Sequence, residues 1–339
     1  MTADAAYRLA REGTAMLWQG DFQNARQLLR AVARRADRTR RRRSGEPSRS
    51  PIEAFREHRR AQSRRARVQG MVLIPLERDY TIPLRRSPDV RQACTEVYGP
   101  ADESSVVSLP ELLGLIGAHE WRKKGVWVPA LADRIHPHYG VFSPVRGEYV
   151  DLVAEAPLPS RQLAFDIGTG TGVLAAVLAR RGVERVVATD LDPRALTCAR
   201  ENLARLGLAD RVHAVGADLF PDGRAPLVVC NPPWLPARPT SPIEHAVYDP
   251  ESRMLRGFLA GLIDHLEPDG EGWLVLSDFA EHLGLRPRAE LLAAFDTAGL
   301  TVVARTDVEP KHPRTRDDGD PLHAVRAAEM TSLWRLAAS

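Results

Sequence analysis

The sequence predicts an α/β protein whose C-terminal part is built on a doubly wound, mostly parallel β-sheet. Short apolar segments alternate with helical segments from residue 163 onward. Glycines follow the first apolar segment, and acidic residues end the next two. Alternating strands and helices favour a parallel sheet that is covered by helices on both faces.

The expected elements of this part follow in order along the chain. The strands are expected at 163–168, 185–190, 211–218, 225–230, 272–279, 300–306 and 330–336. The helices are expected at 172–182, 193–207, 252–266 and 288–298. Asp192 and Pro193 form a typical helix start, an N-cap followed by proline at the first helical position. No helix is expected between the last two strands, which predicts an antiparallel hairpin at one edge of the sheet.

The N-terminal part is expected to be mainly helical and strongly basic. Helices are predicted at 4–36, with a break at Gly20-Asp21, and at 52–69 and 109–124, with a solvated linker at 38–51. The proline-rich stretch 71–100 yields no assignment. We therefore divide the chain into residues 1–125, the basic and mainly helical region, and residues 126–339, the α/β domain.

Positive charge is concentrated in one segment. Residues 34–67 hold 14 arginines, no lysine and 4 acidic residues, a local charge of +10, whereas the rest of the chain carries −7. Such a segment can bind a phosphate backbone through counterion release. It is equally compatible with a solvated linker, because the whole chain prefers arginine and contains only three lysines.

Cysteine and hydropathy patterns indicate a cytoplasmic protein without a membrane span. The three cysteines lie far apart, and Cys198 and Cys230 are expected to pack as small apolar residues. The N-terminus has no apolar leader, and no apolar run approaches the roughly 20 residues of a membrane span. His136 and His138 have no cysteine or carboxylate at ligand spacing, so a turn or surface role is expected and no metal site.

The first chemical motif is DIGTGTG at residues 166–172, between a predicted strand and a predicted helix. Its glycines allow a tight turn and a close approach to a ligand. Asp190 ends the next strand, where a carboxylate can accept both hydroxyls of a ribose, and Asp218 ends the third. An acidic residue ahead of the glycines suits a ligand with a cationic amino group better than a pyrophosphate.

The second motif, Asn231-Pro232-Pro233-Trp234, follows the fourth strand. The Asn231 side-chain oxygen and the Pro232 carbonyl are two acceptors that suit a planar NH₂ group. Holding both N–H groups can aim the nitrogen and stabilise charge that develops on it. Trp234 can stack on the flat face of the acceptor. Glu148, in the loop before the first motif, is a candidate for lining the substrate entrance, and no general base is assigned.

The first motif closely resembles motif I of class I S-adenosylmethionine (SAM)-dependent methyltransferases, which have a Rossmann-like fold. The second resembles the [DNS]-PP-[YFW] motif of amino- and amide-methylating enzymes. The resemblance implies that Asp166 and the glycines lie near the methionine part of SAM, Asp190 on the ribose and Asp218 near the adenine. The full set of expected SAM-binding residues is Asp166, Gly168, Thr169, Gly170, Gly172, Asp190, Leu191, Asp218, Leu219 and Asn231, and the expected catalytic residues are Asn231, Pro232, Pro233 and Trp234.

Over about residues 140–305, the order of motifs is similar to that of the HemK-like release-factor glutamine methyltransferases and their relatives with small methyltransferase domains. Residues 141–154 resemble the substrate-adjacent loop of that family, and 247–266 its segment after the prolines. Trp234 stands where the family usually has tyrosine, and SRMLRG replaces a glycine-rich stretch. The resemblance implies a protein glutamine amide as acceptor, for example in a translation factor.

Three other functions remain open. The arginine-rich segment favours methylation of an exocyclic base amine in rRNA or tRNA. A small-molecule amine or amide is another acceptor. A non-catalytic SAM sensor that binds nucleic acid is the alternative from a different class, although it would have no use for the Asn-Pro-Pro-Trp clamp. The acceptor and the oligomeric state do not follow from the sequence.

Overall fold

The computed structural model describes the chain except for residues 44–49, 240–243, 245 and 312–319. Its residues form two compact units, Met1–Trp121 and Arg122–Ser339. The division at 125/126 drawn from the sequence stays a prediction about domain organisation. Part of the predicted linker lies at 44–49, outside the described residues.

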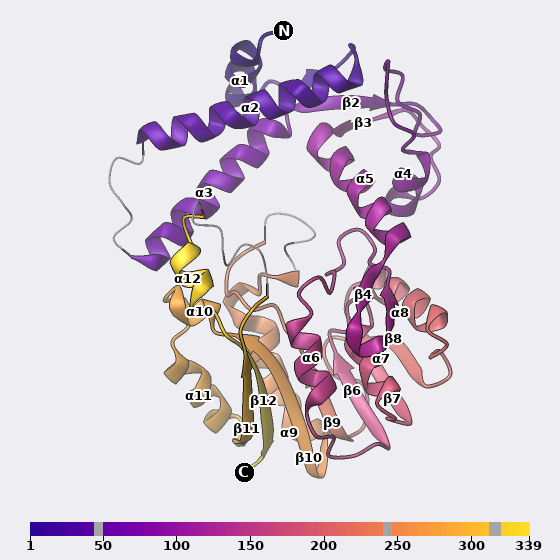
Figure 1. Cartoon of the computed structure of the whole chain (residues 1–339), viewed down its shortest axis with the longest axis vertical. Coiled ribbons are helices and arrows are strands. Elements are labelled where there is room, and N and C mark those ends of the chain that lie inside the picture. The colour runs from indigo at the N-terminus through magenta and orange to yellow at the C-terminus, as the bar shows by residue number, and fades with distance from the viewer. Residues whose placement is uncertain (44–49, 240–243, 245, 312–319) are drawn as a thin grey trace. The chain divides into compact units, whose positions relative to one another are not determined.

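The N-terminal unit combines helices with a small sheet (Figure 1). Its helices are α1 (Ala3–Glu12), α2 (Phe22–Arg43), α3 (Pro51–Gln69), α4 (Arg91–Tyr98) and α5 (Leu109–Lys124). Its strands β1 (Met16–Leu17), β2 (Val72–Leu76) and β3 (Ser105–Ser108) form a sheet in that order, and only the first pair is parallel. The last residues of α5 belong to the second unit.

The predicted helices at 52–69 and 109–124 are confirmed, but two expectations for the N-terminal unit are wrong. The break expected at Gly20-Asp21 is present, but it begins earlier than predicted, because α1 ends at Glu12 and β1 lies between α1 and α2. The predicted linker at 38–51 is helical as far as Arg43. Arginine is a good helix former, and no glycine or proline interrupts the sequence before Gly45, so the charged run extends the helix.

The second unit contains a seven-stranded sheet in the order β11-β12-β10-β9-β6-β7-β8, and β10, β9, β6, β7 and β8 run parallel (Figure 1). Its strands are β6 (Leu163–Ile167), β7 (Arg185–Asp190), β8 (Val212–Gly216), β9 (Ala225–Cys230), β10 (Leu266–Ser277), β11 (Leu300–Val308) and β12 (Thr331–Ala338). A separate pair, β4 (Val126–Val128) and β5 (Asp133–Ile135), is antiparallel. The predicted doubly wound, mostly parallel sheet is confirmed.

The antiparallel pairing predicted for the last two strands is confirmed. The prediction that no helix lies between these two strands in the chain is wrong. β11 pairs antiparallel with β12, and β12 also pairs antiparallel with β10, so β12 lies inside the sheet rather than at its edge. A short helix, α12 (His323–Ala327), lies between β11 and β12 in the chain. This arrangement places the residues that precede β12 beside the end of β10.

Helices cover both faces of the sheet. The helices of this unit are α6 (Glu148–Glu155), α7 (Val173–Arg180), α8 (Pro193–Arg205), α9 (Arg253–His265), α10 (Phe279–His282) and α11 (Arg288–Thr297), with 3₁₀ turns at Pro129–Leu131 and Pro250–Ser252. Side chains of α6, α7 and α8 pack with Leu227 and Val229 on one face, and α9 and α11 pack with Val228 and Cys230 on the other. The alternation along the buried strand β9 thus separates the two halves of the core.

Two further findings bear on the expectations from composition. None of the helices in the described part of the chain is long and apolar enough to cross a membrane. Cys94, Cys198 and Cys230 are all buried free thiols. Burial raises the pKa of Cys198 to about 11 and that of Cys230 well above its ordinary value, so neither thiol is an activated nucleophile.

Candidate active site

The two sequence motifs leave neighbouring strands at the same level of the sheet. Ile167 and Cys230, the last residues of β6 and β9, lie opposite each other, and Ile167 also lies opposite Thr189 of β7. The chain crosses from β8 back over β6 to reach β9, so the strand order reverses between β6 and β9. Open α/β sheets bind ligands at the carboxyl ends of their strands at such a reversal.

The glycine turn after β6 is closed on one side and open on the other. Gly168, Gly170 and Gly172 have φ values of 71°, 57° and 81°, in the left-handed region. A Cβ on Gly172 would lie 3.3 Å from the Cα of Ala199, so glycine lets the start of α7 approach α8. A Cβ on Gly170 would meet no atom within 4 Å, which leaves space there for a ligand.

Asp166 supports this turn from inside the protein. Its side chain is only 1% exposed, and its Oδ2 accepts hydrogen bonds from the Thr169 hydroxyl at 2.6 Å and from the Ala175 N–H at 3.1 Å. Burial raises the pKa of Asp166 to about 6. Thr169 is buried as well, and its N–H donates to the Thr189 carbonyl. A contact of either residue with a cofactor stays a prediction.

Asp190 joins the end of β7 to the glycine turn. One carboxylate oxygen accepts the Gly170 N–H at 2.9 Å, and the other accepts the Asp192 N–H at 2.9 Å. Burial raises the pKa of Asp190 above its ordinary value. The next residue, Leu191, is 64% exposed and presents an apolar surface beside this carboxylate.

Asp218 and Leu219 lie beyond the end of β8, which stops at Gly216 rather than at 218 as predicted. Asp218 is exposed and forms an ion pair of 2.8 Å with Arg253 at the start of α9. Leu219 has a φ of 78°, and its carbonyl accepts the Thr189 hydroxyl. The structure thus ties this segment to both β7 and α9.

The Asn-Pro-Pro-Trp segment closes on itself. The indole Nε1–H of Trp234 donates to Oδ1 of Asn231 at 2.9 Å. Pro232 is buried, whereas Asn231, Pro233 and Trp234 are half-buried. Trp234 packs against the core on both faces of the sheet. The atom expected to receive the acceptor N–H is therefore already bonded to a neighbouring side chain, a contact that sequence reasoning missed.

Beside Trp234 lies a second set of charged side chains that sequence reasoning also missed. The guanidinium carbon of Arg146 lies 5.1 Å from the centroid of the Trp234 ring. Arg146 donates to Glu148 at 2.7 Å and to Glu329 at 3.0 Å, and both carboxylates are almost fully buried. Only Glu148 was a candidate from the sequence, because nothing local places Glu329 near residue 146.

Residues 248–249 lie beside Leu235, which follows the Asn-Pro-Pro-Trp segment directly. Leu235 pairs with Tyr248, and the Asp249 N–H donates to the Leu235 carbonyl. The buried Asp249 carboxylate accepts the N–H groups of Met254 and Leu255 and so caps α9. A Cβ on Gly168 would lie only 2.4 Å from the terminal methyl of Met254, so the two groups would clash. Residues 249–254 therefore reach the glycine turn.

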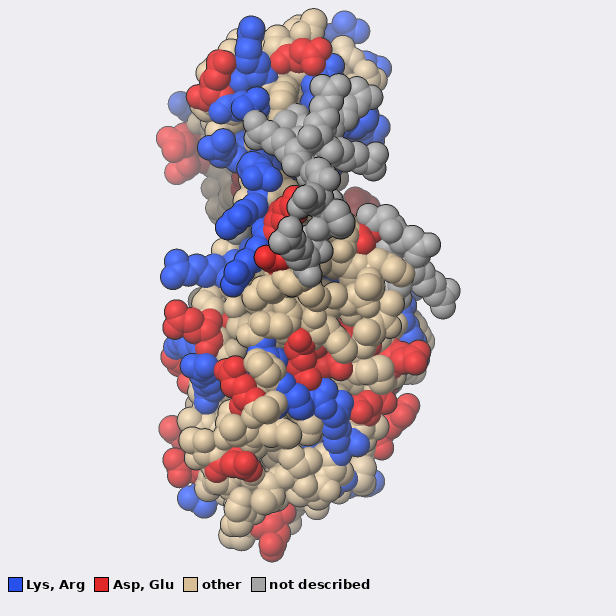
Figure 2. Space-filling model, turned by 90° about the vertical axis from the view of Figure 1, so that its left-hand side faces the viewer, with Lys and Arg blue, Asp and Glu red and all other residues tan. Residues whose placement is uncertain are grey.

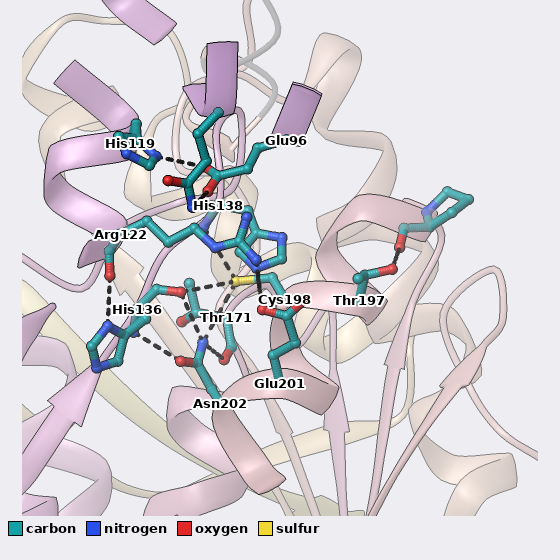
Figure 3. Close-up of polar contacts among 12 residues, drawn as sticks. Glu96, His119, Arg122, His136, His138, Thr171, Thr197, Cys198, Glu201 and Asn202 are labelled. Atoms are coloured by element: carbon teal, nitrogen blue, oxygen red, sulfur yellow. Dashed lines mark hydrogen bonds and ion pairs between the residues drawn. The ribbon is translucent and has the colours of Figure 1, made fainter. Parts of the chain in front are cut away.

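Figure 3 shows how α8 is attached to the segment before the glycine motif. Asn202 accepts the His136 N–H at 2.8 Å and donates to the carbonyls of His136 and Thr171. His138 pairs with Glu201 at 3.0 Å. These contacts give both histidines a structural role, and the described residues contain no group of His, Cys, Asp and Glu side chains that could hold a metal ion.

The comparisons with known proteins agree with this geometry. The family model "Methyltransferase small domain" matches residues 134–305, just over half of the chain. A release factor glutamine methyltransferase of Cereibacter sphaeroides is 37% identical over 165 residues, 47% of this chain and 55% of the relative. A ribosomal protein L11 methyltransferase of Brucella abortus is 30% identical over 154 residues, 45% and 47% of the two chains.

Among the solved structures that the chain resembles is the ribosomal protein L11 methylase of Lactobacillus delbrueckii subsp. bulgaricus. The two sequences are 18% identical, and the TM-score is 0.43. The match covers 61% of this chain and 86% of the methylase. A SAM-dependent methyltransferase of Thiobacillus denitrificans in complex with S-adenosyl-L-homocysteine (SAH) has 17% identity, a TM-score of 0.39, and coverage of 57% and 91%.

The sheet order and the glycine turn define a class I methyltransferase domain. The chain belongs to the methyltransferase small domain family, whose members use SAM. The family resemblance drawn from the two motifs is thereby confirmed. The chain spans about half the length of the curated relatives described above.

The residues at this edge fit SAM. An open space lies above Gly170, a carboxylate stands beside it at Asp190, and the exposed Leu191 follows. These groups match a sugar with two hydroxyls and a flat base. The nearest ionisable groups of the turn, Asp166 and Asp190, are acidic, which suits a cationic ligand rather than a pyrophosphate. The individual roles of the predicted SAM-binding residues stay predictions.

Proposed function

We propose that this protein is an N-methyltransferase that transfers a methyl group to a planar NH₂ nitrogen. The observation that carries the proposal is the register of β6 and β9, which brings the starts of the glycine turn and of the Asn-Pro-Pro-Trp segment to the same level. Bound SAM supplies a methyl group on a positively charged sulfur. In this proposal the Asn231 side-chain oxygen and the Pro232 carbonyl bind the two N–H groups and orient the nitrogen.

The acceptor in this proposal is a protein side-chain amide, that of glutamine. The relative from Cereibacter sphaeroides is named for glutamine methylation of a release factor, and that from Brucella abortus for methylation of a ribosomal protein. Both names specify protein substrates. An amide nitrogen is a poor nucleophile because its lone pair is delocalised. Binding of both N–H groups can therefore raise the rate of methyl transfer most for such an acceptor. We include in this proposal the cytoplasmic location that the sequence predicts.

Radiolabelled SAM and cell extract test this proposal directly. The purified full chain is incubated with both, and the products are treated separately with RNase and with protease. We expect label that survives RNase and is lost on protease treatment, followed by recovery of methylglutamine after proteolysis. Label that RNase removes would contradict the protein acceptor, and label in small molecules alone would favour a metabolite. Binding of SAH without transfer to any fraction would favour the sensor.

RNA is the second candidate acceptor, and one observation on α3 favours it. Arg56, Arg60, Arg64 and Arg67 recur every three or four residues and are all exposed. None of the ion pairs found among the described residues involves any of these four arginines. They span roughly 16 Å of helix axis at about 1.5 Å per residue, a length that can follow several phosphates of one strand. Figure 2 shows basic side chains gathered over the N-terminal unit.

A charge-removing variant tests the arginine stripe, defined as Arg56, Arg60, Arg64 and Arg67. Replacing the four arginines by glutamine is expected to lower RNA affinity and to reduce the slope of log K against log salt by up to about 0.7 per lost phosphate contact with a single strand. The matched control replaces the same four residues by lysine, which retains the charge. An unchanged salt slope in the glutamine variant would show that the stripe is a solvated face.

A further inference from the structure

Trp234 makes two contacts on different parts of its indole. Its ring lies under the Arg146 guanidinium, 5.1 Å from ring centroid to guanidinium carbon, and its N–H bonds to Asn231 Oδ1 at 2.9 Å. A tyrosine or phenylalanine ring has no N–H at this position, so the second contact is specific to tryptophan. The indole thus connects Arg146 to the side chain that is proposed to bind the acceptor.

Arg146 itself is held by two carboxylates, one two residues further along the chain and one 183 residues away. Its Nε donates to Glu148 at the start of α6, and one terminal nitrogen donates to Glu329, just before β12. Glu329 also accepts the hydroxyl of Ser277, the last residue of β10, at 2.7 Å. The two carboxylates are 2% and 3% exposed. Because a guanidinium is planar, two separate anchors fix the orientation of the group, and its carbon lies over the Trp234 ring.

The amide of Asn231 poses a problem that this arrangement solves. An asparagine side chain presents an oxygen or an NH₂ group, depending on a rotation of its amide. An acceptor NH₂ requires the oxygen, because two donors facing each other repel. The Trp234 N–H bonds to the oxygen and so selects one of the two orientations. A carbonyl oxygen has two lone pairs, so Oδ1 retains capacity for the acceptor N–H.

We propose that Arg146, held by Glu148 and Glu329, is a positioning residue that orients Trp234 and, through its indole N–H, fixes the acceptor-binding oxygen of Asn231. The expected effect of Arg146 on methyl transfer rests on the proposed function. Its structural content, the coupling of Arg146 to the Trp234 indole, is independent of that function. Arg146 touches neither the cofactor nor the acceptor in this proposal.

The indole N–H resonance of Trp234 in a ¹H–¹⁵N NMR spectrum of the full chain tests the coupling. The resonance is assigned by its absence in Trp234→Phe. Arg146→Lys keeps a positive charge beside the two buried carboxylates but loses the planar fork, so the chain is expected to fold and the resonance to move. The matched control is Arg305→Lys, because Arg305 lies 4.6 Å from the Trp334 ring centroid in a similar contact. A Trp234 resonance that is the same in wild type and Arg146→Lys overturns the proposal.

A kinetic double-mutant cycle tests the consequence for transfer, with radiolabelled SAM and cell extract as the acceptor source. Arg146→Lys and Trp234→Phe are each expected to lower the transfer rate about tenfold, with SAH affinity within about twofold of wild type, since one orienting hydrogen bond is lost. The double variant is expected to be no slower than Trp234→Phe alone, because both act through one contact. Losses that simply multiply would overturn the proposal. Absence of transfer by the wild type would instead contradict the proposed function, and the NMR result would still decide the coupling.

Discussion

The two halves of the sheet edge are built differently. On the β6–β7 side, Asp166 bonds to Thr169 and Ala175, and Asp190 bonds to Gly170 and Asp192, so these contacts stay within residues 166–192. On the β9–β10–β12 side, Trp234 lies beside Arg146, and Arg146 bonds to Glu329, which is 183 residues away in the chain. The β6–β7 side, to which we assign the cofactor and which we call the cofactor half, is therefore held mainly by local bonds. The β9–β10–β12 side, to which we assign the acceptor and which we call the acceptor half, is assembled from distant parts of the chain.

The largest effect should come from the acceptor half. Asn231→Ala is expected to lower the transfer rate roughly a hundredfold, the scale measured for removal of one group that stabilises developing charge. SAH affinity, measured by calorimetry, should fall far less than the transfer rate. Asn231→Asp keeps an acceptor oxygen and should retain more activity than Asn231→Ala. Equal transfer by Asn231→Ala and wild type would refute the role given to this residue.

The next effect concerns the buried carboxylate of the cofactor half. The pKa of Asp166 is raised to about 6 by burial, above the roughly 3.9 of an unfolded chain. The folded state therefore holds the proton more tightly, and the stability that this provides is present below pH 4 and is lost as the pH rises through 6. Two units correspond to about 3 kcal/mol, at 1.36 kcal/mol per unit.

Asp166→Asn removes this titration and is the variant that measures it. Urea unfolding of wild type and variant between pH 4.5 and 8 should give a stability difference that shifts in favour of the variant by about 2 kcal/mol as the pH rises, because part of the effect is already lost at pH 4.5. Groups that titrate in both proteins cancel in the difference. A difference independent of pH would show that the carboxylate is ionised throughout, and the pKa of Asp166 would then be unperturbed by burial.

The smallest expected effects are those of alanine substitutions at two glycines of the same turn, Gly170 and Gly172. Gly170→Ala and Gly172→Ala both place a side chain at positive φ, a cost of about 1–2 kcal/mol. At residue 172 the new Cβ also meets the Ala199 backbone, and overpacking adds about 1–3 kcal/mol. Gly172→Ala should therefore lose more stability, while Gly170→Ala should lose SAH affinity with a smaller loss of stability. Identical losses of stability and SAH affinity in the two variants would contradict the distinction between a closed and an open side of the turn.

Much of this molecule followed from local sequence. The alternation of apolar and helical segments predicted the strands from β6 to β9, because both faces of a parallel sheet are buried and leave continuous apolar runs. The spacing of Gly168, Asp190 and Asn231 after those strands predicted their meeting at one edge. The arginine run after residue 36 was harder to interpret, because its high charge favours a solvated linker whereas the helix propensity of arginine favours a helix, and α2 extends further than expected.

The sequence by itself therefore determined the parallel sheet, the glycine turn after its first strand and the family. Tertiary structure alone decided that β12 lies between β10 and β11, which brings Glu329 to Arg146 and Arg146 to Trp234. The physical reason is that hydrogen bonds and periodicity within a segment are written in adjacent residues, whereas the pairing of distant strands depends on how the whole core packs. The Trp234–Asn231 bond is local, whereas the contact of Arg146 with Trp234, on which the proposed positioning of Asn231 depends, belongs to the second kind.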